Sequence, residues 1–328
     1  MTAQAPPTLA GIGAAAERLA GIAVHTPLIE NPALNARAGG RVLLKAETLQ
    51  RTGSFKFRGA YNFLSQVPTD ARTRGVVAYS SGNHAQGVAA AAEIFDIPAT
   101  IVMPADAPQA KVDNTRGFGA EVVTYDRQTE SREDIAAAIA GESGATLVPP
   151  FDHAWTIEGQ GTVGLEIAAQ CAAMDTRPDE VLVCCGGGGL TSGIAIALAD
   201  RVPSSVIKAV EPTGFDDASR SLIAGQRLSN EPGAASICDA LLSPSTGDLT
   251  FAAMFAHDVT GLSVSDDEVR AAMAYAWRTL KLVLEPGGAV ALAAILSGKV
   301  ETKDRTIVAV LSGGNVDAAL FNACIVDA

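Results

Sequence analysis

The stretch VLVCCGGGGLTSGIAIALA, residues 181–199, contains no charged residue. Its length would satisfy a crude test for a membrane-spanning helix. Four consecutive glycines, Gly186–Gly189, disfavour a continuous helix because glycine is a weak helix former. We therefore interpret the stretch as a buried strand, a glycine loop and a helix that begins near Thr191.

Short β-branched segments alternate with alanine-rich segments along the rest of the chain. The expected strands span residues 76–80, 99–104, 120–125, 180–185, 207–212 and 306–311, and the expected helices span 83–96, 111–119 and 131–142. Apolar strands that alternate with helices indicate parallel sheets covered by helices on both faces. The sequence predicts an α/β fold with two lobes built on mostly parallel, twisted sheets.

Composition excludes several classes of protein. The net charge of −12 argues against nucleic acid and against anionic lipid, because both need clustered Lys and Arg. The five cysteines form no CxxC motif, so we expect free thiols, no disulfide framework and a reducing cytoplasm. The N-terminus lacks a basic region followed by an apolar region, so we expect no signal peptide.

Three polar or glycine-rich loops follow predicted strands. They are SSGNH (80–84), GGGGL (186–190) and SGGN (312–315). Ligands of open α/β sheets bind beyond the carboxyl ends of the strands. We expect all three loops to lie at the same sheet edge, where they would form a binding crevice.

The glycine loop and a lysine between two phenylalanines suggest one cofactor. Glycines let backbone N–H groups approach a phosphate closely, and the following helix adds its N-terminal dipole. The GxxxxGK[ST] pattern of nucleotide-binding loops is missing, and no acidic ribose ligand is evident. Lys56, between Phe55 and Phe57, has an amine that can form a Schiff base, and burial would lower its pKa. A phosphate cradle with such a lysine points to pyridoxal phosphate.

Four motifs together resemble the fold-type II pyridoxal-phosphate enzymes, with threonine/serine dehydratases and serine racemase as the most similar members. The motifs are GSFKFRGA, SSGNHAQGVA, GGGGL and LSGGN, and the likeness runs from HTPL (25–28) to SGGN. The resemblance implies a large cofactor-binding domain over residues 1–72 and 155–328. It implies a small mobile domain over residues 73–154.

The resemblance also implies roles for the cofactor-binding residues. Lys56 matches the Schiff-base lysine, which then acts as the base, and Phe55 matches the ring that stacks on the cofactor. Asn83 matches the amide at the cofactor's 3-hydroxyl, and Ser312 matches the hydroxyl at the pyridine nitrogen. The remaining positions are the phosphate loop and one residue near the cofactor: Gly186, Gly187, Gly188, Gly189, Leu190 and Glu285.

Residues that match the family's substrate site are Ser54, Ser81, Asn83 and His84, which would grip the substrate carboxylate. Ser81 also matches a serine that works on the opposite cofactor face in serine racemase, so a proton donor there would permit racemisation. Arg132 matches an arginine that can reach a dicarboxylate in serine racemase. The alternative is a surface residue in the first turn of a helix capped by Ser131.

Glu211 and Asp217, with the carbonyl of Phe215, match the family's divalent-cation site. Two carboxylates, a carbonyl and waters suit Mg²⁺, Ca²⁺ or Mn²⁺. The alternative is a solvated acidic loop.

The resemblance implies an ammonia-lyase that removes water from a β-hydroxy-α-amino acid such as L-threonine or L-serine. The alternatives are 3-hydroxyaspartate ammonia-lyase, which takes a dicarboxylate, and serine racemase. The expected partners are a small amino-acid substrate and a second copy of the chain in a homodimer.

Overall fold

The structure is a computed structural model that describes all residues except 1–4, 81, 108, 127 and 327–328. Its strands form two separate sheets. The larger has six strands in the order β1-β2-β10-β7-β8-β9: β1 (Leu28–Glu30), β2 (Arg41–Lys45), β7 (Glu180–Cys184), β8 (Val206–Pro212), β9 (Thr260–Val264) and β10 (Thr306–Val310). The smaller has four strands in the order β5-β4-β3-β6: β3 (Val76–Tyr79), β4 (Ala99–Pro104), β5 (Glu121–Tyr125) and β6 (Thr146–Leu147). Among the paired strands of the described residues, only β1 and β2 run antiparallel, which confirms the predicted α/β class.

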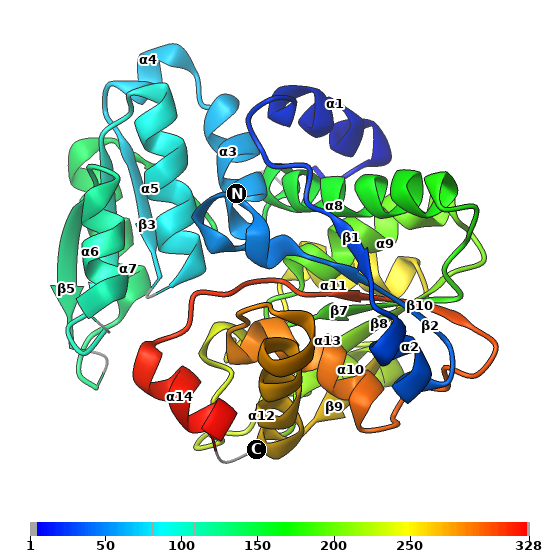
Figure 1. Ribbon diagram of the computed structural model, residues 1–328. Helices are drawn as coiled ribbons and strands as arrows, with labels where there is room; N and C mark the ends of the chain where they lie inside the picture. The colour runs from blue at the N-terminus through cyan, green and yellow to red at the C-terminus, as the bar shows by residue number, and fades with distance from the viewer. Residues whose placement is uncertain (1–4, 81, 108, 127, 327–328) are drawn as a thin grey trace.

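Helices cover both faces of the six-stranded sheet (Figure 1). One face carries α1 (Leu9–Leu19), α8 (Ala154–Ala173), α9 (Gly189–Arg201) and α11 (Asp248–Ala256). The other carries α2 (Pro32–Ala38), α10 (Asp217–Ala224), α12 (Asp266–Tyr275), α13 (Pro286–Leu296) and α14 (Ala318–Val326). Because both faces are covered, every residue of β7 is buried, which explains why this strand is apolar along most of its length.

The four-stranded sheet is also covered on both faces. Alternate residues of β3 enter different cores: Val76 and Ala78 pack in the core that includes α3 (Lys56–Ser65) and α5 (Asn83–Phe95). Val77 packs in the core beneath α7 (Arg132–Ser143). Successive side chains of a strand point to opposite faces of the sheet, so both faces of this sheet are packed. Two further helices, α4 (Thr69–Arg72) and α6 (Gln109–Gly117), complete this lobe on the left of Figure 1.

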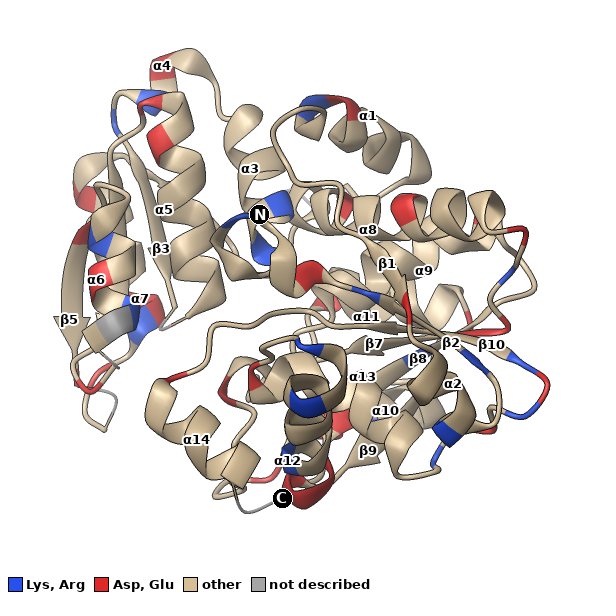
Figure 2. Cartoon of the chain, in the orientation of Figure 1, with Lys and Arg blue, Asp and Glu red and all other residues tan. Residues whose placement is uncertain are grey.

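Short helical turns link the larger elements. They are η1 (Glu47–Leu49), η2 (Arg51–Gly53), η3 (Asp239–Leu241) and a π-helical turn, η4 (Ala276–Leu280). Within the described part of the chain, no helix is both long and apolar enough to cross a bilayer. Lys and Arg are interspersed with Asp and Glu in both lobes (Figure 2).

Two sequence-based expectations need correction. The helix after the glycine loop begins at Gly189 rather than near Thr191, because Gly188 turns the chain with a φ of 90° that glycine tolerates. The three loops do not lie at one sheet edge. SSGNH follows β3 of the four-stranded sheet, whereas GGGGL and SGGN follow β7 and β10 of the six-stranded sheet. They still meet, because residues from the ends of these three strands line one cavity between the two sheets.

Candidate active site

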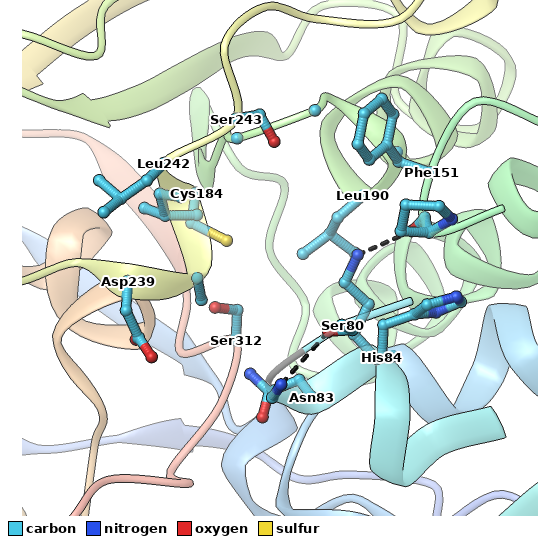
Figure 3. Close-up of a pocket in the computed structure, with 18 of the residues that line it drawn as sticks. Ser80, Asn83, His84, Phe151, Cys184, Leu190, Asp239, Leu242, Ser243 and Ser312 are labelled. Carbon is cyan, nitrogen blue, oxygen red and sulfur yellow. Dashed lines mark hydrogen bonds between the residues drawn. The ribbon is translucent and has the colours of Figure 1, made fainter. Parts of the chain in front are cut away.

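The cavity between the two lobes is lined by most of the residues singled out in the sequence. These are Phe55, Lys56, Asn83, His84, Arg132, Gly186, Gly187, Gly188, Gly189, Leu190, Glu285 and Ser312. Figure 3 shows Cys184, Ser312 and Asp239 on one side of the cavity and Phe151 and His84 on the other. Ser54 is fully buried beside this lining, whereas Glu211, Phe215 and Asp217 lie outside it.

Lys56 is the first residue of α3 and its amine is enclosed by protein. The Nζ atom donates a hydrogen bond to the carbonyl of Pro150 at 2.7 Å and lies 5.4 Å from the centre of the Phe55 ring. Burial lowers the pKa of the Lys56 amine from 10.5 to about 8. A larger share of neutral, nucleophilic amine is therefore present near neutral pH than for an exposed lysine.

A tight turn before Lys56 fixes its position. Thr52 and Gly53 both have positive φ angles, of 61° and 72°. For a β-branched residue such a conformation costs about 1–3 kcal/mol, so neighbouring contacts must hold it. Asn315 supplies one, since its Nδ2 donates to the Thr52 carbonyl at 2.6 Å. Ser54 then pairs with Gly313, which ties the lysine turn directly to the SGGN loop.

Arg58 fixes the start of α3 through contacts with two carboxylates. Its buried guanidinium bonds Glu47 at 2.8 Å and Glu166 at 2.6 Å. Burial opposes the charge, but these two carboxylates raise the pKa of Arg58 overall. Arg58 therefore holds α3 against η1 and α8. Phe57, the residue before it, is fully buried.

The glycine loop packs closely against Phe151 because it has no side chains. A Cβ atom on Gly187 would lie 2.3 Å from the Phe151 ring, and one on Gly189 would lie 3.0 Å from Phe151 Cβ. The loop leads into the first turn of α9, whose backbone N–H groups lack intrahelical acceptors. These donors and the helix dipole make an anion site at the cavity wall.

Asn83 joins both halves of the cavity through its amide. Its Nδ2 donates to Glu285 at 2.5 Å, and its Oδ1 accepts from Asn315 at 2.7 Å. Burial, and then the charge of Asp239, raise the pKa of Glu285 to about 7. Glu285 thus exchanges its proton close to neutral pH, beside the amide that the sequence assigned to the cofactor's hydroxyl.

Two features of the cavity suit a substrate carboxylate. Among the described residues, the buried hydroxyl of Ser54 has no hydrogen-bond partner. The N-terminus of α5, at Asn83 and His84, opens into the cavity.

The ring of His84 is neutral. Burial, and then the charge of Lys56, lower the pKa of His84 to about 3, and its Nε2 donates to the Val148 carbonyl at 3.0 Å. Ser81 lies outside the described residues.

Arg132 lies at the start of a helix and also lines the cavity. It is the first residue of α7, and Ser131 caps this helix by accepting from the Asp134 N–H at 3.2 Å. The Arg132 side chain is 40% exposed and pairs with Glu133 at 2.9 Å. The same guanidinium lies over the Tyr79 ring and lines the cavity. A cation is therefore available at the cavity mouth.

Comparisons with known proteins agree with this geometry. A family model described as pyridoxal-phosphate dependent enzyme matches residues 20–313. The chain belongs to this family. An L-threo-3-hydroxyaspartate ammonia-lyase from a Pseudomonas species is 43% identical over 92% of this chain and 93% of its own. A protein of the same name from Saccharomyces cerevisiae is 39% identical over 97% and 96%, respectively. The structure of maize serine racemase matches with a TM-score of 0.91 and 35% identity, covering 98% of each chain.

The residues present fit the family's cofactor. The buried amine of Lys56 suits an aldehyde, and the side-chain-free loop at Gly186–Gly189 suits a phosphate. Ser312, which is 3% exposed, and Asn83 supply polar groups for a ring nitrogen and a ring hydroxyl. Pyridoxal phosphate is therefore the cofactor of this family member.

Several lining residues escaped the sequence reasoning. Tyr79, Lys111, Phe151, Cys184 and Asp239 also line the cavity. Tyr79 and Cys184 are the last residues of strands that lead into recognised motifs, so their positions in the sequence could have indicated that they line the cavity. Lys111 and Asp239 form an ion pair at 2.7 Å, from α6 to η3. Asp239 begins the short turn η3, and no sequence signal indicated it.

The candidate metal ligands are buried rather than solvated. Glu211 is fully buried and accepts from the N–H groups of Ala218 and Ser219, at 2.9 and 2.8 Å. Asp217 accepts from Asn230 and from the Thr246 N–H, at 2.6 and 2.8 Å. The alternative of a solvated acidic loop is therefore wrong. Among the described residues, no group of three or more His, Cys, Asp or Glu side chains could hold a metal ion.

Proposed function

We propose that the protein is an ammonia-lyase that converts a β-hydroxy-α-amino acid into a 2-oxo acid and ammonia. The observation that carries the proposal is the buried Lys56 amine, placed between a phosphate loop and the N-terminus of α5 in one cavity. The ammonia-lyase names of two relatives support it.

When bound, pyridoxal phosphate supplies an aldehyde that condenses with amines and a conjugated ring that accepts an electron pair from Cα. Lys56 would hold this aldehyde, and its Nζ would take up the α-proton of the substrate, a task suited to an amine whose pKa is about 8. Loss of the β-hydroxyl as water, followed by hydrolysis, gives the 2-oxo acid and ammonia.

The chain's own groups orient the substrate for this elimination. The unpaired hydroxyl of Ser54 and the first N–H groups of α5 bind the α-carboxylate. Ser312 would offer a neutral hydroxyl to the ring nitrogen of the cofactor, and a neutral partner would not force protonation of that nitrogen.

Within this class we favour 3-hydroxyaspartate over threonine or serine. A second carboxylate on the substrate requires a cation, and Arg132 offers one at the cavity mouth. The hydroxyl and methyl groups of serine and threonine require none. Two relatives, at 43% and 39% identity, are named for 3-hydroxyaspartate, although a third, at 38% identity, is named L-threonine ammonia-lyase.

The Lys56→Ala variant tests the role of the lysine. It should lose the absorption band of lysine-bound cofactor and release no ammonia from any β-hydroxy amino acid. A matched control is Lys303→Ala, which changes a lysine outside the cavity lining. Retention of the band in Lys56→Ala protein would show that another group anchors the cofactor.

We also propose a divalent cation at Glu211, Asp217 and the Phe215 carbonyl. The support is that, in the described part of the chain, neither buried carboxylate has an ion-pair partner. Burial raises the pKa of Glu211 to about 8, as expected for a carboxylate that lacks a cation. Chelation should lower thermal stability or activity, and no change in either would exclude the site.

The remaining proposals concern assembly. We propose a cytoplasmic homodimer whose residues 73–154 form a small mobile domain. Exposed apolar side chains at Leu49, Trp277 and Val283 support an interface, and the free thiols of all five cysteines suit the cytoplasm. A monomer mass in light scattering would contradict the dimer. Small-angle scattering that is unchanged by substrate would contradict domain movement.

A further inference from the structure

The start of α11 holds one carbonyl of the glycine loop. Thr250 Oγ1 donates to the Gly187 carbonyl at 2.7 Å, and the Gly247 N–H reaches the same oxygen at 3.4 Å. In a trans peptide the C=O and the N–H point in opposite directions. The contact with Thr250 therefore turns the N–H of Gly188 away from α11. Without side chains, this peptide has little else to fix its orientation.

Asp152 in turn fixes the first turn of α11. Its Oδ1 accepts from the N–H groups of Leu249 and Thr250, at 2.9 and 3.3 Å, and its Oδ2 accepts from Asp248 N–H at 3.0 Å. The usual capping position of this helix is Gly247, which has no capping side chain. A Cβ atom there would lie 2.2 Å from the Asp152 carboxylate. The cap therefore comes from a residue far away in the sequence, which occupies the space that a local cap would need.

The segment that carries Asp152 contacts the other parts of the cofactor site. The carbonyl of Pro150 accepts from Lys56 Nζ, and the ring of Phe151 packs where a Cβ on Gly187 would lie. A shift of this segment would therefore move the lysine contact and the phosphate loop together.

We propose that Asp152 is a positioning residue for the phosphate cradle, which it orients through Thr250 at the start of α11. The inference goes beyond the proposed function, since it concerns how the chain retains its cofactor and not which substrate it takes. A carboxylate that merely capped a helix would affect the free energy of unfolding alone. A positioning residue affects cofactor retention as well.

The test compares how fast variant holoenzymes lose pyridoxal phosphate on dialysis, followed by cofactor absorbance. Thr250→Val should lose cofactor about 5- to 10-fold faster than wild type, the effect of one missing hydrogen bond. Thr250→Ser keeps the hydroxyl and should retain cofactor as wild type does. Asp152→Ala should resemble Thr250→Val, and the double variant should be no faster than the faster single variant, because both changes act on one contact.

The matched control is Ser265→Ala, which removes the side-chain cap of α12. It should lower the melting temperature without changing the rate of cofactor loss. The proposal is overturned if Asp152→Ala behaves like Ser265→Ala, or if Thr250→Ser loses cofactor as fast as Thr250→Val. Should Asp152→Ala fail to fold, the two Thr250 variants decide the question by themselves.

Discussion

The two sides of the cavity are built differently. The cofactor side, defined by Lys56, Gly186–Gly189 and Ser312, is tied together by hydrogen bonds, and Gly187–Gly189 and Ser312 are buried. The substrate side, defined by Tyr79, Lys111 and Arg132, presents cations whose partners Asp239 and Glu133 are 49% and 53% exposed. Exposed ion pairs contribute little to stability, so they can exchange partners or change in sequence at small cost. We infer that the cofactor side fixes the reaction type and the substrate side selects the substrate.

The largest expected effect comes from filling the cofactor side. Gly187→Ala would place a methyl group 2.3 Å from the Phe151 ring, so either the ring or the loop must move. We expect at least about a 100-fold loss of affinity for pyridoxal phosphate, because several phosphate contacts would be displaced together. Affinity is measured by titrating cofactor absorbance.

The control for this change is Gly141→Ala in α7, where an added Cβ would meet nothing within 4 Å. It should leave cofactor affinity unchanged and should stabilise the protein by about 0.5–1 kcal/mol, as alanine does in place of glycine inside a helix. Equal cofactor affinity in Gly187→Ala and wild type would contradict a preformed phosphate cradle.

The ion pair of Lys111 with Asp239 is expected to close the cavity mouth between the lobes. Lys111→Asp places two carboxylates together, so KM should rise about tenfold with a smaller change in kcat. Adding Asp239→Lys to this variant restores opposite charges and should recover most of the lost kcat/KM. No recovery in the double variant would mean that Lys111 acts apart from Asp239.

A smaller effect, on how the free energy of unfolding depends on pH, is expected from His84, which lies between the cofactor side and the substrate side of the cavity. Its folded pKa of about 3 lies below the usual 6.5, so the unfolded chain binds the extra proton between these values. The stability that depends on a neutral His84 is therefore present above about pH 6.5 and is lost as the pH falls towards about 3. Compared with His84→Gln, wild-type protein should lose about 1 kcal/mol more between about pH 6 and about pH 5. Parallel unfolding curves for the two proteins would contradict a buried neutral ring.

A different division, between contacts of chain neighbours and contacts that form only on folding, separates what the sequence could predict from what it could not. Gly186–Gly189 and the Lys56 turn are local patterns, since their chemistry depends on neighbours in the chain. Asp152 and Thr250 meet only through folding, and Asp239 reaches the cavity from the short turn η3. The composition of a segment predicts where a strand ends, but it does not predict which sheet the strand joins. For this reason the sequence predicts one sheet edge for all three loops, whereas SSGNH follows a strand of the four-stranded sheet.

The most direct test of the account measures ammonia and 2-oxo acid released from L-threonine, L-serine and each 3-hydroxyaspartate isomer. Wild-type protein and Arg132→Gln are compared, with Arg116→Gln as a control outside the cavity lining. We expect one 3-hydroxyaspartate isomer to be the best substrate, and Arg132→Gln to reduce kcat/KM for it about 10- to 100-fold, the effect of one charged hydrogen bond. Rapid turnover of threonine or serine that Arg132→Gln leaves unchanged, with no reaction of any hydroxyaspartate, would contradict the proposed division of the cavity.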